Sequence, residues 1–185
     1  KWKHPELPIK LARRLKDKGL KFNMKMVGSG VLFQRAKRLI HQLNVSDCIS
    51  LTGNKSNQEV LNLMHCSQIF IISSDENEGW GAVANESMSN GCVLVASDAI
   101  GSAPYLIEAG KTGFGFKSCD IDSLTEKVEW LIEHPMEMLD IQRNAYRVMK
   151  DIWNPRQAAL NLLTLINDIQ NGQVISIEYG PCSYA

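Results

Sequence analysis

The strongest constraint on the fold is an alternation of short apolar runs with amphipathic stretches along the chain. Two runs, QIFIISS at residues 68–74 and CVLVAS at residues 92–97, are continuously apolar and rich in β-branched side chains. Such runs are typical of parallel strands covered on both faces, and the amphipathic stretches between them are typical of the covering helices. The pattern predicts an α/β chain with a doubly wound parallel sheet, in which residues 68–74 form a central strand.

The remaining elements follow from local signals. Ser56 followed by Glu59 is a capping-box signature, which predicts the start of a helix. Gly19 suits a helix C-terminus, and Pro135 and Pro155 mark breaks between helices. We therefore expect strands at residues 22–27, 48–53, 68–74, 92–97 and 112–116, and helices at 7–19, 32–43, 56–64 and 83–89, within 101–110, and from 120 to about 171.

Composition narrows the classes of function. The chain of 185 residues has 20 Lys plus Arg and 20 Asp plus Glu, and this zero net charge argues against a polycationic nucleic-acid binder. Five cysteines and four histidines without regular spacing suggest neither a zinc site nor a disulfide framework, and fit a reduced, cytoplasmic protein. No apolar run approaches the ~20 residues that cross a bilayer.

The chain begins with Lys1 in place of an initiator Met, so we expect it to be a piece of a larger protein. Residues 1–171 are expected to form one domain, followed by a C-terminal tail at 172–185.

An acidic, glycine-rich stretch, DENEGWGAVANESMSNG at residues 75–91, directly follows the expected central strand. Open α/β sheets bind ligands outside the carboxyl ends of their strands, where helix N-termini offer free N–H groups to phosphates. Gly79 and Gly81 would let a ligand approach the backbone, and Glu78 and Glu86 could accept hydrogen bonds from vicinal hydroxyls of a ribose or hexose. Taken singly, Glu86 suits a solvated helix residue and Glu78 a charge that stabilises the helix dipole. Their coincidence at one strand end favours a site for a sugar and a phosphate.

Five segments, in order along the chain, carry a family resemblance: MVGSG, ISLTG, EGWGAVANE, NGCVLVASD and IGSAPYLIEAGKTGF. Together they resemble the retaining glycosyltransferases of the GT-B fold known as glycosyltransferase family 4, or group 1, and EGWGAVANE resembles the E-x7-E segment of that family. The similarity covers about residues 3–169. The chain departs from the usual pattern at Cys92 and Val93, where the family commonly has a proline, and at Tyr105, where it has a glutamate. We expect both changes to affect packing, with an altered donor or acceptor contact as the alternative for Tyr105.

The resemblance implies a Rossmann-like domain, the C-terminal, donor-binding half of a GT-B enzyme whose N-terminal domain is absent from this chain. It implies that Glu78, assigned as the catalytic residue, hydrogen-bonds donor-sugar hydroxyls near the reacting carbon, and that Glu86 holds the ribose. Lys3 matches a lysine that contacts the diphosphate, with a solvated surface lysine as the alternative. Backbone contacts to the sugar and diphosphate would come from Gly79, Trp80, Gly81, Ala82 and Val83.

The implied activity is that of a retaining glycosyltransferase, which transfers a sugar from a nucleotide diphosphate sugar, such as a UDP- or GDP-sugar, to a polysaccharide, glycolipid or other acceptor. No cofactor, metal site or nucleic-acid partner is implied. We expect the chain to be inactive without its N-terminal partner domain, and the enzyme to be cytoplasmic or peripheral at the inner face of the membrane through that domain. The alternative is a non-catalytic sugar-nucleotide-binding module or the domain of a GT-B-like epimerase.

Overall fold

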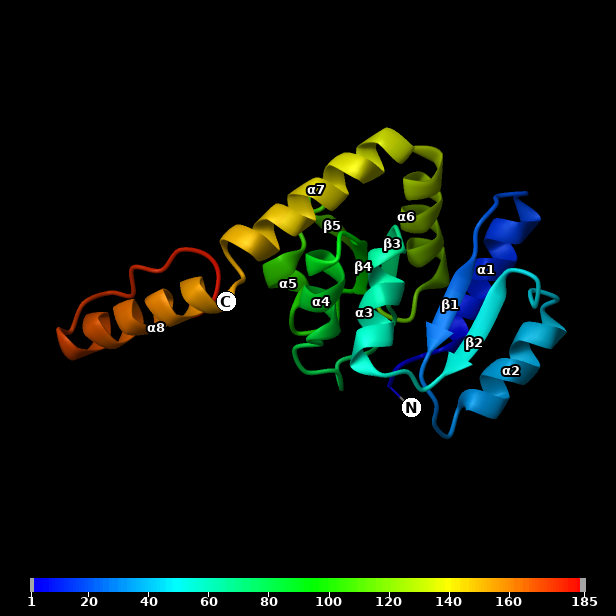
Figure 1. Cartoon of the computed structure of the whole chain (residues 1–185), viewed down its shortest axis with the longest axis horizontal. Helices are drawn as coiled ribbons and strands as arrows, with labels where there is room; N and C mark the ends of the chain where they lie inside the picture. Colours follow the sequence, from blue (N-terminus) through cyan, green and yellow to red (C-terminus); the bar gives the residue numbers. More distant parts are fainter. Residues whose placement is uncertain (1, 184–185) are drawn as a thin grey trace.

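The computed structural model describes residues 2–183, so Lys1 and residues 184–185 lie outside the described part of the chain. Helices and strands alternate along the sequence in the expected order, with small differences at their boundaries (Figure 1). The strands are β1 (Met24–Val27), β2 (Ile49–Gly53), β3 (Ile69–Ile72), β4 (Val93–Ser97) and β5 (Gly113–Phe116). The helices are α1 (Glu6–Asp17), α2 (Phe33–Gln42), α3 (Asn57–His65), α4 (Val83–Ser89), α5 (Ala103–Leu106), α6 (Ile121–Glu133), α7 (Pro135–Asp151) and α8 (Pro155–Gln170).

The strands form two parallel sheets. β1 pairs with β2, and β4 lies between β3 and β5. Figure 1 shows β5, β4, β3, β1 and β2 in this order across the molecule. The parallel α/β architecture is confirmed, but the structure differs from one expectation: within the described residues, β3 lies at the edge of its sheet and β4 takes the centre.

Helices cover both faces of the three-stranded sheet. All five residues of β4 are buried, because alternate side chains of a strand point to opposite faces and both faces are covered. Val93 and Val95 pack in a cluster with α1 and α6. Leu94 and Ala96 pack in a second cluster with α4, α5 and α7. The predicted doubly wound arrangement is therefore present around β4.

Helix α1 joins the two sheets. Leu7, Leu11 and Leu15 belong to the cluster that contains β4. Ile9 and Ala12, on another side of the same helix, pack in a third cluster with α2 and β2. A single helix thus supplies apolar side chains to both parts of the core.

The predicted helix starts are confirmed in detail. At α3 the backbone N–H of Glu59 donates to the Ser56 hydroxyl at 3.3 Å, and the backbone N–H of Ser56 donates to the Glu59 carboxylate at 2.9 Å. At α8 the side chain of Asn154 accepts from the N–H of Gln157 at 2.8 Å, and Pro155 occupies the first turn. Both caps satisfy N–H groups that a helix start leaves without partners.

Cys92 is buried directly ahead of β4. Its thiol donates to the carbonyl of Met64 at 3.1 Å, and burial raises the pKa of the thiol to about 11. Cys92 therefore packs in the core, while the effect of the departure from the family pattern stays a prediction.

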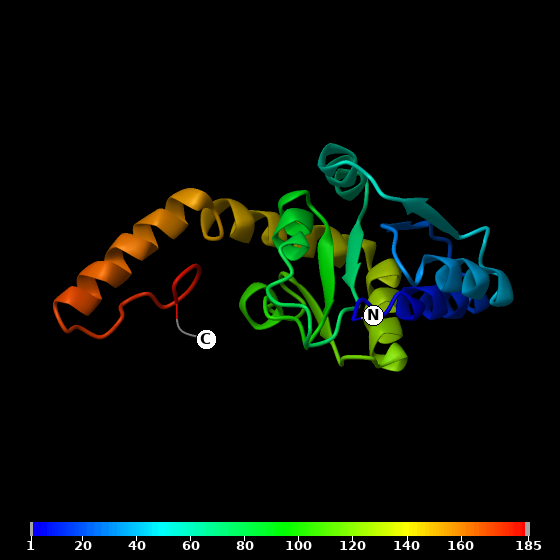
Figure 2. The ribbon, with the colours of Figure 1, turned by 90° about the horizontal axis from the view of Figure 1, so that it is seen from below.

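Helix α8 leads away from the rest of the molecule, and the chain then returns alongside it (Figures 1 and 2). Two buried polar side chains of α8 hold the returning segment. Asn161 donates to the carbonyl of Pro181 at 2.7 Å, and the carboxylate of Asp168 accepts from the N–H and hydroxyl of Ser176 at 2.9 and 2.8 Å. The division of the chain at residue 171 remains a prediction. No helix among residues 2–183 is long and apolar enough to cross a membrane.

Candidate functional site

The N-terminal segment of the chain is fixed against the carboxyl end of β3. The N–H of Asp75 donates to the carbonyl of Trp2 at 2.9 Å, and the hydroxyl of Ser73 donates to the carbonyl of Lys3 at 2.8 Å. The side chains of His4 and Asp75 are hydrogen-bonded at 2.8 Å, and this bond is the main cause that raises the pKa of His4. These contacts bring the Lys3 side chain to the loop that follows β3.

Lys3 and Glu78, both predicted as site residues, are paired with each other. The Lys3 ammonium donates to the Glu78 carboxylate, and the hydroxyl of Ser74 donates to the same carboxylate oxygen at 3.2 Å. The hydrogen bond from Lys3 is the main cause that holds the pKa of Glu78 below its ordinary value. Glu78 is therefore an ionised acceptor whose side chain is 17% exposed, with a cation beside it that is 56% exposed. The sequence predicted both residues at the site but not their pairing.

The glycine loop packs backbone to backbone against the loop that precedes α5. The N–H of Gly101 donates to the carbonyl of Gly79 at 2.8 Å, and a Cβ on Gly101 would lie 2.7 Å from that oxygen. Gly81 has a φ of +71°, in the left-handed region that favours glycine. A Cβ at Gly79 would meet no atom within 4 Å, so the absence of a side chain leaves open space there. The loop is thus fixed on one side and accessible at Gly79.

Helix α4 starts with unused backbone donors, close to the predicted position. Ala82 precedes the first turn and provides no side-chain cap. Within residues 2–183, the N–H groups of Gly81 and Ala82 have no hydrogen-bond acceptor, and the first backbone bonds run from Ala84 to Gly81 at 2.8 Å and from Glu86 to Ala82 at 3.2 Å. Ala82 and Val83 are exposed, so this backbone can contact a ligand.

Glu86, the second acid of the motif, lies in α4 and is half-buried. In the described part of the chain, its carboxylate has neither a hydrogen-bond donor nor an ion-pair partner. The two acids therefore differ, because the Glu78 carboxylate is ion-paired with Lys3 while the carboxylate of Glu86 is available. Both remain predicted site residues.

Trp80, in the loop, packs against Tyr105 and Trp153, an aromatic cluster that the sequence did not predict. The ring centroid of Trp80 lies 5.4 Å from that of Tyr105 and 5.3 Å from that of Trp153. The indole N–H of Trp80 also donates to the side chain of Asn85 in α4 at 2.7 Å. Tyr105 therefore makes packing contacts, and the alternative contact to a donor or acceptor stays a prediction. Residues so far apart in sequence carry no spacing signal that would have revealed the cluster.

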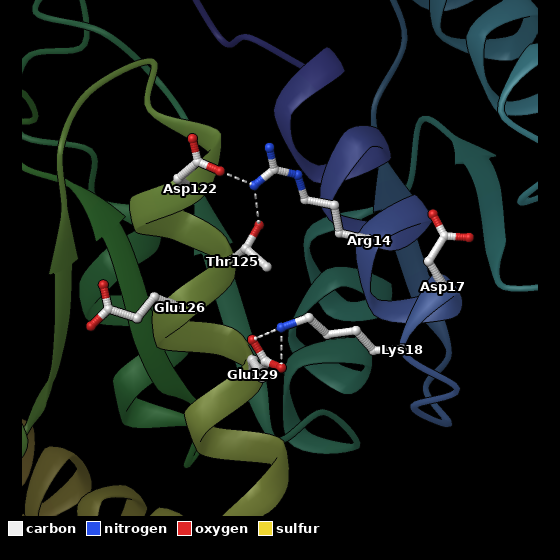
Figure 3. Close-up of a pocket in the computed structure, with 7 residues that line it drawn as sticks. All are labelled: Arg14, Asp17, Lys18, Asp122, Thr125, Glu126 and Glu129. Atoms are coloured by element: carbon white, nitrogen blue, oxygen red, sulfur yellow. Dashed lines mark hydrogen bonds and ion pairs between the residues drawn. The ribbon is translucent and has the colours of Figure 1, made fainter.

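A separate cavity of about 430 Å³ lies between α1 and α6 (Figure 3). Ion pairs join Arg14 to Asp122 and Lys18 to Glu129 across it (Figure 3). It is lined by Arg14, Asp17, Lys18, Asp122, Thr125, Glu126 and Glu129. None of these residues belongs to the stretch 75–91, and the charges at its centre are already paired, so we assign no ligand to this cavity. Among residues 2–183, no group of three or more His, Cys, Asp or Glu side chains could hold a metal ion.

The doubly wound sheet and the strand-end loop with its unused amides are features of α/β domains that bind phosphorylated ligands at the ends of their strands. The sequence narrows this class of α/β domains to one family. It belongs to the family described as glycosyl transferases group 1, whose sequence model matches residues 1–148. The resemblance drawn from the motifs is confirmed at the level of this family.

A relative is similar to the chain in sequence, and two solved structures are similar to it in fold. The chain is 28% identical, over 160 residues, to the putative colanic acid biosynthesis glycosyltransferase WcaL of Salmonella typhimurium, covering 83% of this chain and 38% of WcaL. Its fold is similar to that of Alr3699/HepE of Anabaena in complex with UDP and glucose, with a TM-score of 0.72 at 18% identity, covering 92% of this chain and 45% of that chain. It is also similar to the C-terminal domain of the group 1 family protein LpcC of Francisella tularensis, with a TM-score of 0.72 at 22% identity. That match covers 81% of this chain and 80% of the LpcC domain.

The chain therefore spans about two fifths of WcaL but most of the LpcC domain. Solved structures of GT-B glycosyltransferases with a similar fold confirm the predicted α/β, Rossmann-like fold class.

Proposed function

We propose that this chain is the donor-binding half of a retaining glycosyltransferase and that it binds a nucleotide diphosphate sugar where β3 ends. The observation that carries the proposal is the position of Lys3 beside an ionised Glu78, next to the unused amides at the start of α4. Membership of the group 1 family supports it, as do the UDP and glucose named for HepE and the C-terminal domain named for LpcC.

The site offers opposite charges to different parts of a donor. The ammonium of Lys3 and the N–H groups of Gly81 and Ala82 suit the anionic diphosphate and would stabilise it as a leaving group. The carboxylates of Glu78 and Glu86 suit hydroxyl groups, because an ionised carboxylate accepts hydrogen bonds and does not donate them. When a diphosphate attracts Lys3, the Glu78 carboxylate becomes available to hydroxyls of the donor sugar near the reacting carbon.

Glu86 is the most direct test of nucleotide binding. Its carboxylate has no partner in the described part of the chain, so Glu86→Ala removes hydrogen bonds to the ribose without breaking a contact of the protein. We expect binding of UDP or GDP, measured by calorimetry, to weaken by about 1–3 kcal/mol, or roughly fivefold to 150-fold. Glu76→Ala is the matched control, since it removes the same charge from an exposed position of the same stretch. Equal affinity of wild type and Glu86→Ala would return Glu86 to the role of a solvated helix residue.

Glu78 separates sugar recognition from nucleotide recognition. Glu78→Gln should weaken binding of the whole donor more than binding of the nucleoside diphosphate alone, because the proposed partners of Glu78 are sugar hydroxyls. The comparison uses UDP against UDP-sugars and GDP against GDP-sugars. Equal losses for both members of a pair would contradict the sugar-facing role.

Transfer itself is tested on the complete protein, because acceptor binding is assigned to the N-terminal domain and the 185-residue chain is expected to be inactive. We expect the product to keep the anomeric configuration of the donor, which NMR of the product reads directly. A polysaccharide acceptor is the first choice, supported by the colanic acid named for WcaL, with a glycolipid as the second. A complete protein that binds the donor but transfers it to no acceptor would favour the non-catalytic module.

A further inference from the structure

His4 lies between two carboxylates that come from different parts of the chain. Its Nε2 atom is 2.8 Å from a carboxylate oxygen of Asp75, in the loop after β3, and its Nδ1 atom is 3.0 Å from one of Glu6, in the first turn of α1. The side chain of His4 is 23% exposed, and those of Asp75 and Glu6 are 18% and 34% exposed. The imidazole ring therefore bridges α1 and the strand-end loop at a largely buried position.

These two contacts define the protonation state of His4. An ionised carboxylate only accepts hydrogen bonds, so each ring nitrogen that faces one must carry a proton, and both nitrogens do so only in the imidazolium form. The hydrogen bonds to Asp75 and to Glu6, in this order, are the main causes that raise the pKa of His4 above its ordinary value of 6.5. In turn, the backbone N–H of Asn77 and then His4 lower the pKa of Asp75 to about 2. His4 is therefore a cation between two anions.

One further titratable side chain faces His4. The Sγ atom of Cys119, in the turn before α6, lies 3.9 Å from the Nε2 atom of His4. A thiol is a weak partner at this distance, and the same nitrogen has the shorter contact with Asp75. The ammonium of Lys3, the neighbour of His4 in sequence, donates to Glu78 and leaves the two carboxylates around His4 to the imidazolium.

The backbone of His4 makes the turn that leads from Lys3 into α1. Its φ is +43°, in the left-handed region that residues other than glycine rarely adopt. Its carbonyl accepts from the N–H of Leu7 at 3.0 Å, at the start of α1, and from the hydroxyl of Ser73 at 3.3 Å. A backbone conformation of this kind persists only where surrounding contacts hold it. The two hydrogen bonds of the imidazolium are such contacts, so the path of the chain at residues 2–3 depends on them.

We propose that His4 is a positioning residue of the donor site: its imidazolium fixes the turn that holds Lys3 beside Glu78, and the affinity for the donor falls when His4 loses its proton. A neutral imidazole leaves one ring nitrogen facing a carboxylate with no proton between them, which loosens the turn. A loosened Lys3 must be ordered again when a diphosphate binds, and this ordering reduces affinity. The role rests on the proposed function, because the position of Lys3 affects a ligand only where the donor binds.

The direction of the pH dependence follows from the raised pKa of His4. The stabilising contribution of its two hydrogen bonds is complete below the ordinary pKa of 6.5 and is lost as the pH rises through the higher pKa of the folded state. Donor affinity should therefore decrease on the alkaline side of pH 6.5. Lysine side chains keep their charge at these pH values, so a site that used Lys3 without His4 would show no such decrease.

Calorimetry with a UDP-sugar and a GDP-sugar, carried out on the 185-residue chain from pH 6 to pH 8.5, tests the proposal. Both phosphates of such a donor are esterified, so its charge stays constant, whereas the terminal phosphate of UDP titrates at about pH 6. We expect the affinity of the wild type to fall about threefold to tenfold across this range. His4→Gln, which carries no charge, should bind at every pH as weakly as the wild type does at pH 8.5. His65→Gln is the matched control, since it makes the same change at an exposed position of α3 and should keep the wild-type profile.

Glu6→Gln provides a readout that a merely structural role would not move. Among residues 2–183, the side chain of Glu6 has no hydrogen bond or ion pair except those with His4. Its carboxylate is one of the causes that raise the pKa of His4, so in Glu6→Gln the fall of donor affinity should occur at lower pH than in the wild type. Cys119→Ser should leave the pH of this fall unchanged. An unshifted profile for Glu6→Gln would contradict the proposal.

A wild-type affinity that stays constant from pH 6 to pH 8.5, or a fall that persists in His4→Gln, would overturn the role of His4. If no donor binds at any pH, the proposed function fails, and the hold of His4 on residues 2–3 is decided without a ligand. The reporter is the N–H of Asp75, which donates to the carbonyl of Trp2, and its protection from hydrogen exchange is followed by NMR. Protection that decreases as His4 loses its proton supports this hold, and constant protection contradicts it.

Discussion

Strand β4 and helix α8 place their apolar side chains in opposite surroundings. All five residues of β4 are buried between two layers of helices. On α8 the buried residues are Asn161 and Asp168, and several large apolar side chains are exposed. The exposed side chains are Leu160, Leu162, Leu163, Ile166 and Ile169.

The difference teaches where the stability of the domain originates. Burial of a Leu or Val side chain contributes about 1.5–3 kcal/mol to the free energy of unfolding, and β4 buries such side chains on both of its faces. Helix α8 is held to the returning chain by polar contacts instead. The family match ends at residue 148, before α8 begins. The core around β4 should therefore unfold as one unit, whereas the segment beyond α8 should open locally.

The largest expected effect tests the core directly. Leu94→Ala should lower the free energy of unfolding by about 2–5 kcal/mol, because Leu94 is fully buried and its truncation leaves a cavity. Urea unfolding followed by circular dichroism measures the change. Leu163→Ala makes the same chemical change on α8, where the side chain is 64% exposed, and should alter stability by less than about 0.5 kcal/mol. Similar losses for the two variants would show that α8 belongs to the same core.

A smaller effect is expected at the contact between β4 and β5. A Cβ on Gly113 would lie 2.5 Å from the carbonyl oxygen of Leu94, so Gly113→Ala should force the strands apart and lower the free energy of unfolding by about 1–3 kcal/mol. Gly115→Ala on the same strand is the matched control, since a Cβ there meets no atom within 4 Å. Thermal unfolding compares the two variants. A loss at Gly115 as large as that at Gly113 would mean that strand propensity, and not the close approach, is responsible.

On α8 the same kind of test should give a local result. Asp168→Ala removes the acceptor of two hydrogen bonds from Ser176, which are worth about 1–3 kcal/mol when the acceptor is charged. We expect proteolysis within residues 172–183 to accelerate while the unfolding midpoint of the core stays unchanged. Gln170→Ala, at an exposed position of the same helix, should change neither quantity. A lowered unfolding midpoint for Asp168→Ala would show that α8 unfolds together with the core around β4.

The smallest effect concerns pH at the carboxyl edge of the core sheet. The pKa of Glu78 is lowered, mainly by Lys3, so its stabilising contribution is complete above its ordinary pKa of 4.5 and is lost as the pH falls through the lower value of the folded state. Glu78→Gln should therefore flatten part of the loss of stability in acid, measured as the urea midpoint from pH 6 to pH 2. Glu133→Gln, at an exposed position of α6, is the control for the change of charge. Parallel pH profiles for Glu78→Gln and wild type would contradict the assignment.

Much of the fold could be predicted because its signals are local. The capping box at Ser56 and the breaks at Pro135 and Pro155 depend on residues within one turn of each other, and all three are confirmed. The position of residues 68–74 in the sheet could not be predicted in the same way. An apolar run shows that a strand suits burial, but not which strands lie beside it.

For the site, the sequence placed the acids and glycines at one strand end but not their partners. The pairing of Lys3 with Glu78 depends on the path of residues 2–4, which hydrogen bonds to Ser73 and Asp75 determine. The cluster around Trp80 arises in the same way, from three segments that the fold brings together. Contacts between distant segments leave no periodic pattern for a single sequence to display.

Because Cys92 is buried, the rate at which its thiol is alkylated reports the opening of the core. A thiolate is the species that reacts with alkylating reagents, so a thiol with a pKa of about 11 inside the core is inert while the sheet stays closed. Three cysteines are exposed and should be alkylated at once, before any buried thiol reacts: Cys66, Cys119 and Cys182. Two thiols then remain, the half-buried Cys48 and the buried Cys92. The slow appearance of the label on Cys92, located by peptide mapping, would time the opening of the sheet at β4 under native conditions, with no denaturant and no engineered probe.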